Sequence, residues 1–241
     1  MADPLKQFKI EPIVPIEIGG IDLSFTNSSM WMMIAVAVSV IFMSIATRRP
    51  AMVPNRIQAF AEGMYEFIAG MVRDNIGSKG REYFPMIFTI FVVVLLGNML
   101  GMIPYSFTYT SHIAVTMGLA LAIFLFVTIL GFVKHGTHFF SLFCPAGVPW
   151  ALKPLIIPIE VLSYLIRPVT LSVRLFANMM AGHLMLKVFA GFSVLMGVGL
   201  GLVPMFFNVA LIAFEVLIAF LQAYVFAILS CIYLKDAIEL H

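Results

Sequence analysis

Charged residues are scarce in this sequence. Asp, Glu, Lys and Arg make up only 11% of its 241 residues, whereas a soluble domain carries roughly a quarter. Hydrophobic residues make up 62% of the chain, and its mean hydropathy is +1.05. This composition excludes an ordinary soluble domain and indicates a polytopic membrane protein.

Other features are also missing. The net charge is only +2 and no basic cluster occurs, so nucleic acid is not an expected partner. Cys144 and Cys231 are isolated, without pairing or metal spacing, and are predicted to be free thiols. The pair in His135 to His138 lacks a nearby acid or second ligand set. We therefore expect no metal and no cofactor.

Long stretches carry no Lys, Arg, Asp or Glu. A spanning helix needs about 20 apolar residues, so the longest stretch, 83–133, holds two segments as a helical hairpin. The sequence predicts one all-α membrane domain over 1–241, with five membrane segments at about 28–47, 83–104, 111–133, 151–192 and 199–234.

The ends and the basic residues predict an orientation. Residues 1–22 lack the basic start and early apolar core of a signal peptide, so we expect 1–27 to be a short outside tail. Basic residues follow the first segment, whereas Tyr105 to His112 contains neither Lys nor Arg. Because basic residues collect on the cytoplasmic side, we expect the N-terminus outside and, after five crossings, the C-terminus inside.

A further helix is predicted over 54–78, between the first two membrane segments. Apolar residues recur there at helical spacing, and charged residues take much of the other face. This pattern favours an interfacial helix lying on the inner membrane surface. A docking face for a partner is the alternative.

The fourth segment, 151–192, is too long for an upright crossing. About 40 residues at ~1.5 Å each reach ~60 Å, twice the hydrocarbon thickness, so the segment must tilt steeply or break near Pro168. Arg174 lies in it with no neighbouring acid. On a helical projection, four polar residues lie within about 40° of Arg174, and His183 lies on the opposite side. The four are Glu160, Arg167, Thr170 and Asn178.

The last segment, 199–235 at its full extent, carries one polar line. Asn208, Glu215 and Gln222 are spaced by seven residues. An ionisable group at membrane depth costs at least ~2.5 kcal/mol, so it normally faces a cavity or a partner. Together with His183, these residues predict a water path between the two long helices.

Structural roles for these residues are the simpler interpretation. Arg174 could reach an interface or pair with Glu160, and Glu215 with His183 could be a purely structural pair. Asn98 alone is typical of helix packing.

Two motifs identify a family resemblance. PVTLSVRLFANMMAGHLM, residues 168–185, and FEVLIAFLQAYVFAILSCIYL, residues 214–234, closely resemble the a subunit, or subunit 6, of F-type ATP synthases. The order of segments also matches, including LLGNMLGMIPY at 95–105. The arrangement is similar to alphaproteobacterial and mitochondrial members.

The resemblance implies a non-catalytic, proton-conducting stator subunit of the Fo sector. Its two long helices would lie nearly in the membrane plane against a ring of c subunits. The implied partners are that c-ring, b-type peripheral stalk subunits, the F1 sector and the lipid bilayer. A bacterial inner membrane is the implied location, and a mitochondrial inner membrane is less favoured.

The resemblance also implies roles for individual residues. Arg174 matches the essential arginine that faces the c-ring carboxylate and separates two offset half-channels. His183 and Glu215 match the pair that lines the outer half-channel. The remaining implied proton-translocation residues are Asn178 and Gln222 near that route, Glu160 near the inner exit and Asn98 in the channel. Gly101 departs from relatives that carry an acid there.

A secondary transporter with an intramembrane charged site is the main alternative function. Such a transporter usually shows internal repeats, and none is found between the two halves. An intramembrane enzyme would need a nucleophile with its base or a metal set, and the sequence contains neither.

Overall fold

The fold is helical throughout its membrane segments. The computed structural model describes residues 9–15, 17–18, 21–22, 24–48, 51–103, 106–143 and 152–238. Within these ranges, five helices are long and apolar enough to cross a membrane. This confirms the prediction of an all-helical, multi-pass membrane protein.

The N-terminal segment has more structure than the predicted tail. Strand β1 (Pro12–Val14) pairs antiparallel with β4 (Phe25–Thr26), and β2 (Glu17–Ile18) pairs with β3 (Ile21–Asp22). Strands of two or three residues are too short to show an alternating pattern, so no local pattern predicts them. They lead directly into α1 (Asn27–Thr47), whose first turn is capped by the Thr26 side chain.

Helix α2 (Arg56–Ile76) occupies most of the range predicted for an interfacial helix. It is followed by the 3-10 helix η2 (Gly77–Glu82). Its buried side chains, which include Met64, Ile68 and Met71, pack in a core with residues of α3 (Phe84–Gly101) and α7 (Leu202–Ile238). Much of its apolar face is therefore covered by the chain's own helices.

The predicted hairpin consists of α3 (Phe84–Gly101) and α4 (Ile113–His135). The short 3-10 helix η3 (Tyr109–Ser111) lies between them, and η4 (Gly136–Phe143) follows. Cys144 lies outside the described residues, whereas Cys231 on α7 is buried and free.

The two longest helices are α5 (Lys153–Leu195) and α7 (Leu202–Ile238), joined through the single turn α6 (Gly197–Leu200). Helix α5 has 43 residues, or about 65 Å at 1.5 Å per residue. It continues through Pro158 and Pro168, so the break considered near Pro168 does not occur. Packing against α4 and α7 holds the chain on both sides of the proline, and such tertiary contacts can offset the backbone hydrogen bond that proline removes.

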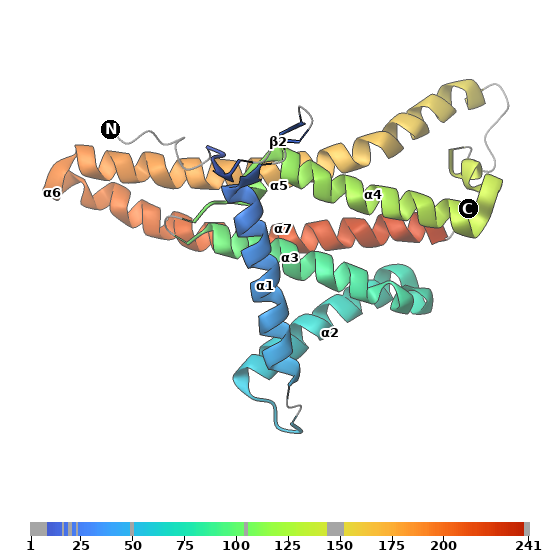
Figure 1. The fold of residues 1–241 in the computed structure, drawn as a ribbon, viewed down its shortest axis with the longest axis horizontal. Helices are drawn as coiled ribbons and strands as arrows, with labels where there is room; N and C mark the ends of the chain where they lie inside the picture. Colours follow the sequence, from blue (N-terminus) through green and yellow to red (C-terminus); the bar gives the residue numbers. More distant parts are fainter. Residues whose placement is uncertain are drawn as a thin grey trace.

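The long helices share one direction and α1 another. Helices α5 and α7 run along the longest axis of the molecule, whereas α1 runs across it (Figure 1). Helix α7 packs against α2, α3, α4 and α5, and its small or apolar residues Ala219, Ala223, Phe226 and Ala227 are fully buried. Helix α7 is therefore the centre of the core.

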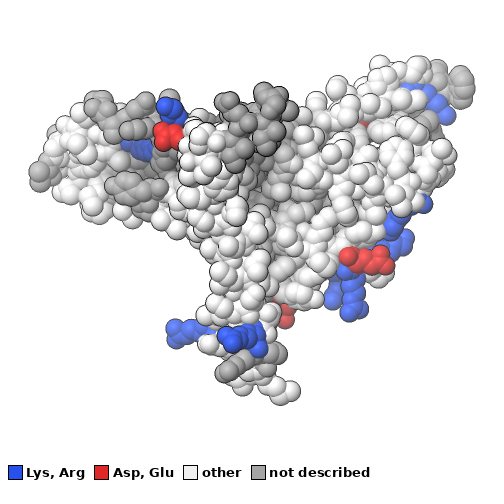
Figure 2. All heavy atoms as spheres, in the orientation of Figure 1, with Lys and Arg blue, Asp and Glu red and all other residues white. Residues whose placement is uncertain are grey.

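Charged side chains lie mostly at the edges of the molecule. Figure 2 shows Lys and Arg at the lower end, at the upper left and along the right-hand edge, with a broad surface between them that is almost free of charge. Many large apolar side chains of α1, α5 and α7 are exposed. An apolar exposed surface between charged edges is what a lipid bilayer requires.

Candidate functional site

Several of the polar residues predicted on the two long helices meet because α5 and α7 run antiparallel. Contacts between them follow in order along both helices, and residue numbers fall on α7 as they rise on α5. The contacts are Arg167 with Asp236, Asn178 with Gln222, His183 with Glu215, and Ser193 with the Gly201 carbonyl. One helix pair therefore carries most of the predicted site.

His183 and Glu215 form a buried pair. The His183 Nδ1 atom lies 3.4 Å from Glu215 Oε1, and the two side chains are 8% and 4% exposed. A Cβ atom on Gly182 would lie only 2.8 Å from that same Oε1 atom. The absence of a side chain at Gly182 therefore makes room for the carboxyl group.

Thr108, in the segment between α3 and α4, completes this group. Its Oγ1 atom donates to the Gly101 carbonyl at 3.0 Å and lies 3.1 Å from His183 Nε2. A threonine hydroxyl has only one proton, so the Thr108 oxygen accepts from a protonated His183 Nε2. The uncharged imidazole then presents the Nδ1 lone pair to Glu215.

The sequence interpretation did not include Thr108. A hydroxyl residue in a loop carries no periodic signal, and its partner His183 is 75 residues further along the chain. Gly101 is buried and packs against Thr108: a Cβ atom there would lie 2.6 Å from Thr108 Cγ2. Threonine therefore fills the space beside Gly101.

His112 is a second histidine near this site, at the start of α4. The His112 ring stacks on Phe107 with centroids 5.0 Å apart. Burial lowers the pKa of the His112 imidazole, which favours its neutral form near pH 7.

Asn178 and Gln222 form a second bridge between the helices. Asn178 Nδ2 donates to Gln222 Oε1 at 2.8 Å. Asn98 lies in the same buried layer, where its Nδ2 donates to the Ala219 carbonyl at 3.4 Å. It therefore joins α3 to α7, one turn of α7 beyond Glu215.

Several buried polar atoms of α7 and of the adjacent α3 have no hydrogen-bond partner among the described residues. Buried polar atoms usually bind protein or ordered water, so their grouping marks a hydrophilic region inside an apolar core. They include Asn98 Oδ1, Asn208 Oδ1, both Glu215 carboxylate oxygens and Gln222 Nε2.

Arg174 stands apart from these buried groups. Its side chain is exposed, next to the exposed apolar Val173. No carboxylate of the described residues pairs with it. Glu160, which is partly buried, lies 14 residues earlier on the same helix, or about 21 Å along its axis. The structural Arg174–Glu160 pair considered from the sequence therefore does not form.

Arg167 is the paired arginine of α5 instead. Its Nη1 donates to Asp236 Oδ2 at 2.8 Å, and its guanidinium lies over the rings of Tyr164 and Tyr233. Thr170, on the same predicted stripe, is exposed and donates to the Arg167 carbonyl. The stripe thus divides into side chains that join α7 and side chains that face outward.

The arrangement places proton-transferring groups and a fixed positive charge at different positions. Imidazole and carboxyl groups can each accept and release a proton, and they lie together in the interior. The guanidinium of Arg174 stays protonated and stands on the outer face. The site can therefore transfer protons at one place and hold a fixed positive charge at another.

A family model described as ATP synthase A chain matches residues 29–235. The chain belongs to this family. Curated relatives named ATP synthase subunit a include a Rhodospirillum rubrum protein, 56% identical over 241 residues with full coverage of both chains. A Paramagnetospirillum magneticum protein is 52% identical, also with full coverage, and one from Parvibaculum lavamentivorans is 54% identical over 98% of this chain and 94% of its own.

Membership in the ATP synthase A chain family confirms the resemblance inferred from the motifs. It also confirms the predicted function, a proton-conducting stator subunit of the Fo sector that performs no nucleotide chemistry. The secondary-transporter alternative is set aside on the same ground.

Proposed function

We propose that α5 and α7 carry protons to and from the carboxylates of a c-subunit ring through two offset half-channels, with Arg174 between them. The observation that carries this proposal is the separation described above. The proton-transferring pair His183–Glu215 is buried between helices, whereas Arg174 is exposed on an apolar face.

Arg174 acts as a barrier and as an electrostatic partner. A fixed guanidinium favours the deprotonated form of a carboxylate that comes near it, and it does not release its own proton. A ring carboxylate that passes Arg174 therefore gives up its proton on one side and gains another only on the far side. Direct leakage between the half-channels is blocked.

His183 and Glu215 transfer protons in the outer half-channel. With Nε2–H directed to Thr108, one proton is shared between His183 Nδ1 and the Glu215 carboxyl group. The unpartnered polar atoms of Asn98, Asn208 and Gln222 support a hydrated route that reaches this pair, because such atoms bind water. Asn178 holds Gln222 in place beside that route.

Glu160 belongs to the inner exit in this proposal. It lies on the opposite side of Arg174 from His183 along α5, and it is partly exposed. His183 is nine residues beyond Arg174, about 13 Å along the helix. The two half-channels are thereby offset along α5 with Arg174 between them.

The offset converts a membrane potential into rotation. A charge that crosses the membrane gains ~2.3 kcal/mol per 100 mV. Since neither half-channel crosses alone, each proton must travel with the ring. The arrangement of α5 and α7 along the long molecular axis, across α1 (Figure 1), supports two strongly tilted helices against that ring.

The proposed assembly includes the c-ring, b-type peripheral stalk subunits and the F1 sector. The proposed location is the inner membrane of a bacterium, with the N-terminus outside and the C-terminus in the cytoplasm.

The test is ATP-driven acidification of inverted membrane vesicles that contain the complex. We expect Arg174→Ala to abolish coupled pumping, because no fixed charge then separates the half-channels, while c-ring co-purification is retained. Val173→Ala is the control, because Val173 lies beside Arg174 on the same helix, is exposed and carries no charge; it should retain the activity. Normal acidification by the Arg174→Ala complex would refute the proposal.

A further inference from the structure

A second polar site lies away from the proton route, at the junction of α2, η2 and α3. A cavity of about 730 Å³ is present there, lined by nine residues. They are Tyr65, Ala69, Val72, Arg73, Gly77, Ser78, Arg81, Phe84 and Pro85. None of the nine is acidic.

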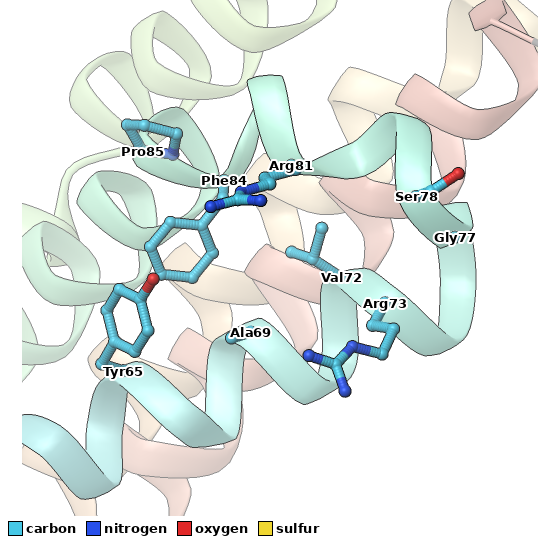
Figure 3. Close-up of a pocket in the computed structure, with 9 residues that line it drawn as sticks. All are labelled: Tyr65, Ala69, Val72, Arg73, Gly77, Ser78, Arg81, Phe84 and Pro85. Carbon is cyan, nitrogen blue, oxygen red and sulfur yellow. The ribbon is translucent and has the colours of Figure 1, made fainter.

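Two arginines give the cavity its charge. Figure 3 shows Arg73 reaching it from α2 and Arg81 from η2. No described carboxylate forms an ion pair with either guanidinium. Two guanidinium groups at one cavity suit a phosphate, whose oxygens accept several charge-assisted hydrogen bonds.

The other part of the cavity is aromatic and apolar. The rings of Tyr65 and Phe84 meet edge to face, with centroids 4.6 Å apart, and Pro85 lies beside them (Figure 3). A soluble anion would need only the basic part. A ligand that uses both parts must carry a negative group joined to an apolar one.

The position of the cavity along the chain indicates which kind of amphipathic ligand it binds. The charged segment Gly77–Glu82 is separated by Tyr83 alone from the apolar helix Phe84–Gly101. The cavity therefore spans the level at which lipid headgroups meet acyl chains. Tyr side chains and basic side chains are typical of that level.

From these observations we propose that the cavity binds the headgroup phosphate of an anionic phospholipid. Arg73 and Arg81 hold the phosphate, and Tyr65 and Phe84 contact the start of the acyl chains. With the orientation predicted from the basic residues, this lipid belongs to the cytoplasmic leaflet. It would fix α2 to the start of α3, and it takes no part in proton transfer.

The experiment measures lipid binding to the intact, delipidated complex. The probes are dihexanoyl phosphatidylglycerol, dihexanoyl phosphatidylcholine and inorganic phosphate. We expect wild type to prefer phosphatidylglycerol to both other probes. The double variant Arg73→Gln/Arg81→Gln should bind phosphatidylglycerol about tenfold or more weakly, since each basic group near the headgroups contributes measurably to binding.

The matched control is Arg48→Gln/Arg56→Gln, which removes the same charge near the start of α2, outside this cavity. Its affinity for phosphatidylglycerol should stay close to that of wild type. An equal loss of affinity in the control would show that diffuse attraction to the basic surface, and not this cavity, binds the phosphatidylglycerol. Inorganic phosphate binding as tightly as phosphatidylglycerol would identify a soluble-anion site and overturn the lipid assignment.

Both arginines are exposed, so their substitution leaves the helix packing unchanged, and co-purification of the c-ring checks this. If the double variant fails to assemble, the preference of the wild-type complex among the three probes still tests the lipid assignment. No preference for phosphatidylglycerol over phosphatidylcholine would overturn the proposal.

Discussion

At the scale of single residues, Thr108 fixes which nitrogen of His183 carries a proton. Its hydroxyl is held between the Gly101 carbonyl and His183 Nε2. Without it, the ring could turn or change tautomer, and Nδ1 would no longer be held toward Glu215. Thr108 is thus a positioning residue, because it acts through His183.

Thr108→Val preserves the shape of the side chain and removes the hydroxyl. We expect proton conduction through Fo to fall by roughly tenfold, as for loss of a buried hydrogen bond worth ~1–2 kcal/mol. Thr108→Ser restores the hydroxyl and should conduct nearly as wild type. Passive proton uptake by vesicles stripped of F1 measures both, and equal rates in the valine variant and wild type would exclude this role.

Gly182 gives a second test at this scale. Because an added Cβ would lie 2.8 Å from Glu215 Oε1, Gly182→Ala must displace the carboxyl group from its place beside His183. We expect several-fold slower proton conduction, approaching Glu215→Gln, with assembly intact. The control Gly191→Ala lies on the same helix, where an added Cβ meets nothing within 4 Å. Similar losses in both variants would indicate an effect on the helix rather than on the carboxyl group.

At the scale of secondary structure, the register between α5 and α7 determines which polar residues meet. Near the α6 turn, the rings of Phe189 and Phe207 stack with centroids 6.2 Å apart. A shift of one residue on either helix would rotate it by about 100° and separate His183 from Glu215. The whole site therefore depends on this one packing arrangement.

Cysteine crosslinking measures that register. In a background with Cys144→Ser and Cys231→Ala, we expect Phe189→Cys/Phe207→Cys to crosslink efficiently. The pair Phe189→Cys/Phe206→Cys should crosslink poorly, because Phe206 lies about 100° around α7 from Phe207. Equal crosslinking of both pairs would mean that the helices do not keep this register.

At the scale of the whole molecule, the orientation in the membrane decides which half-channel faces which side. The excess of Lys and Arg after the first segment predicts an outside N-terminus. We expect a membrane-impermeant maleimide to label Ile10→Cys only from outside and Lys235→Cys only from the cytoplasmic side, in the same cysteine-free background. Labelling of both positions from one side would require an even number of crossings.

Part of this molecule follows from local sequence alone. Membrane embedding, five apolar helices and the polar lines on the last two helices depend on hydropathy and on a repeat of 3.6 residues, both of which are local properties. The Arg174 motif was also specific enough to indicate the family, which the comparisons bear out.

Only the tertiary structure determined which residues of those polar lines are exposed and which contact one another. Helical projection gave the relative directions of Arg174 and His183, but packing determined that the first is exposed and the second meets Glu215. Thr108 came from a loop far away in sequence, and α5 stayed continuous through Pro168 because its neighbours hold it. These outcomes depend on contacts between distant segments, and no pattern within one segment determines its neighbour.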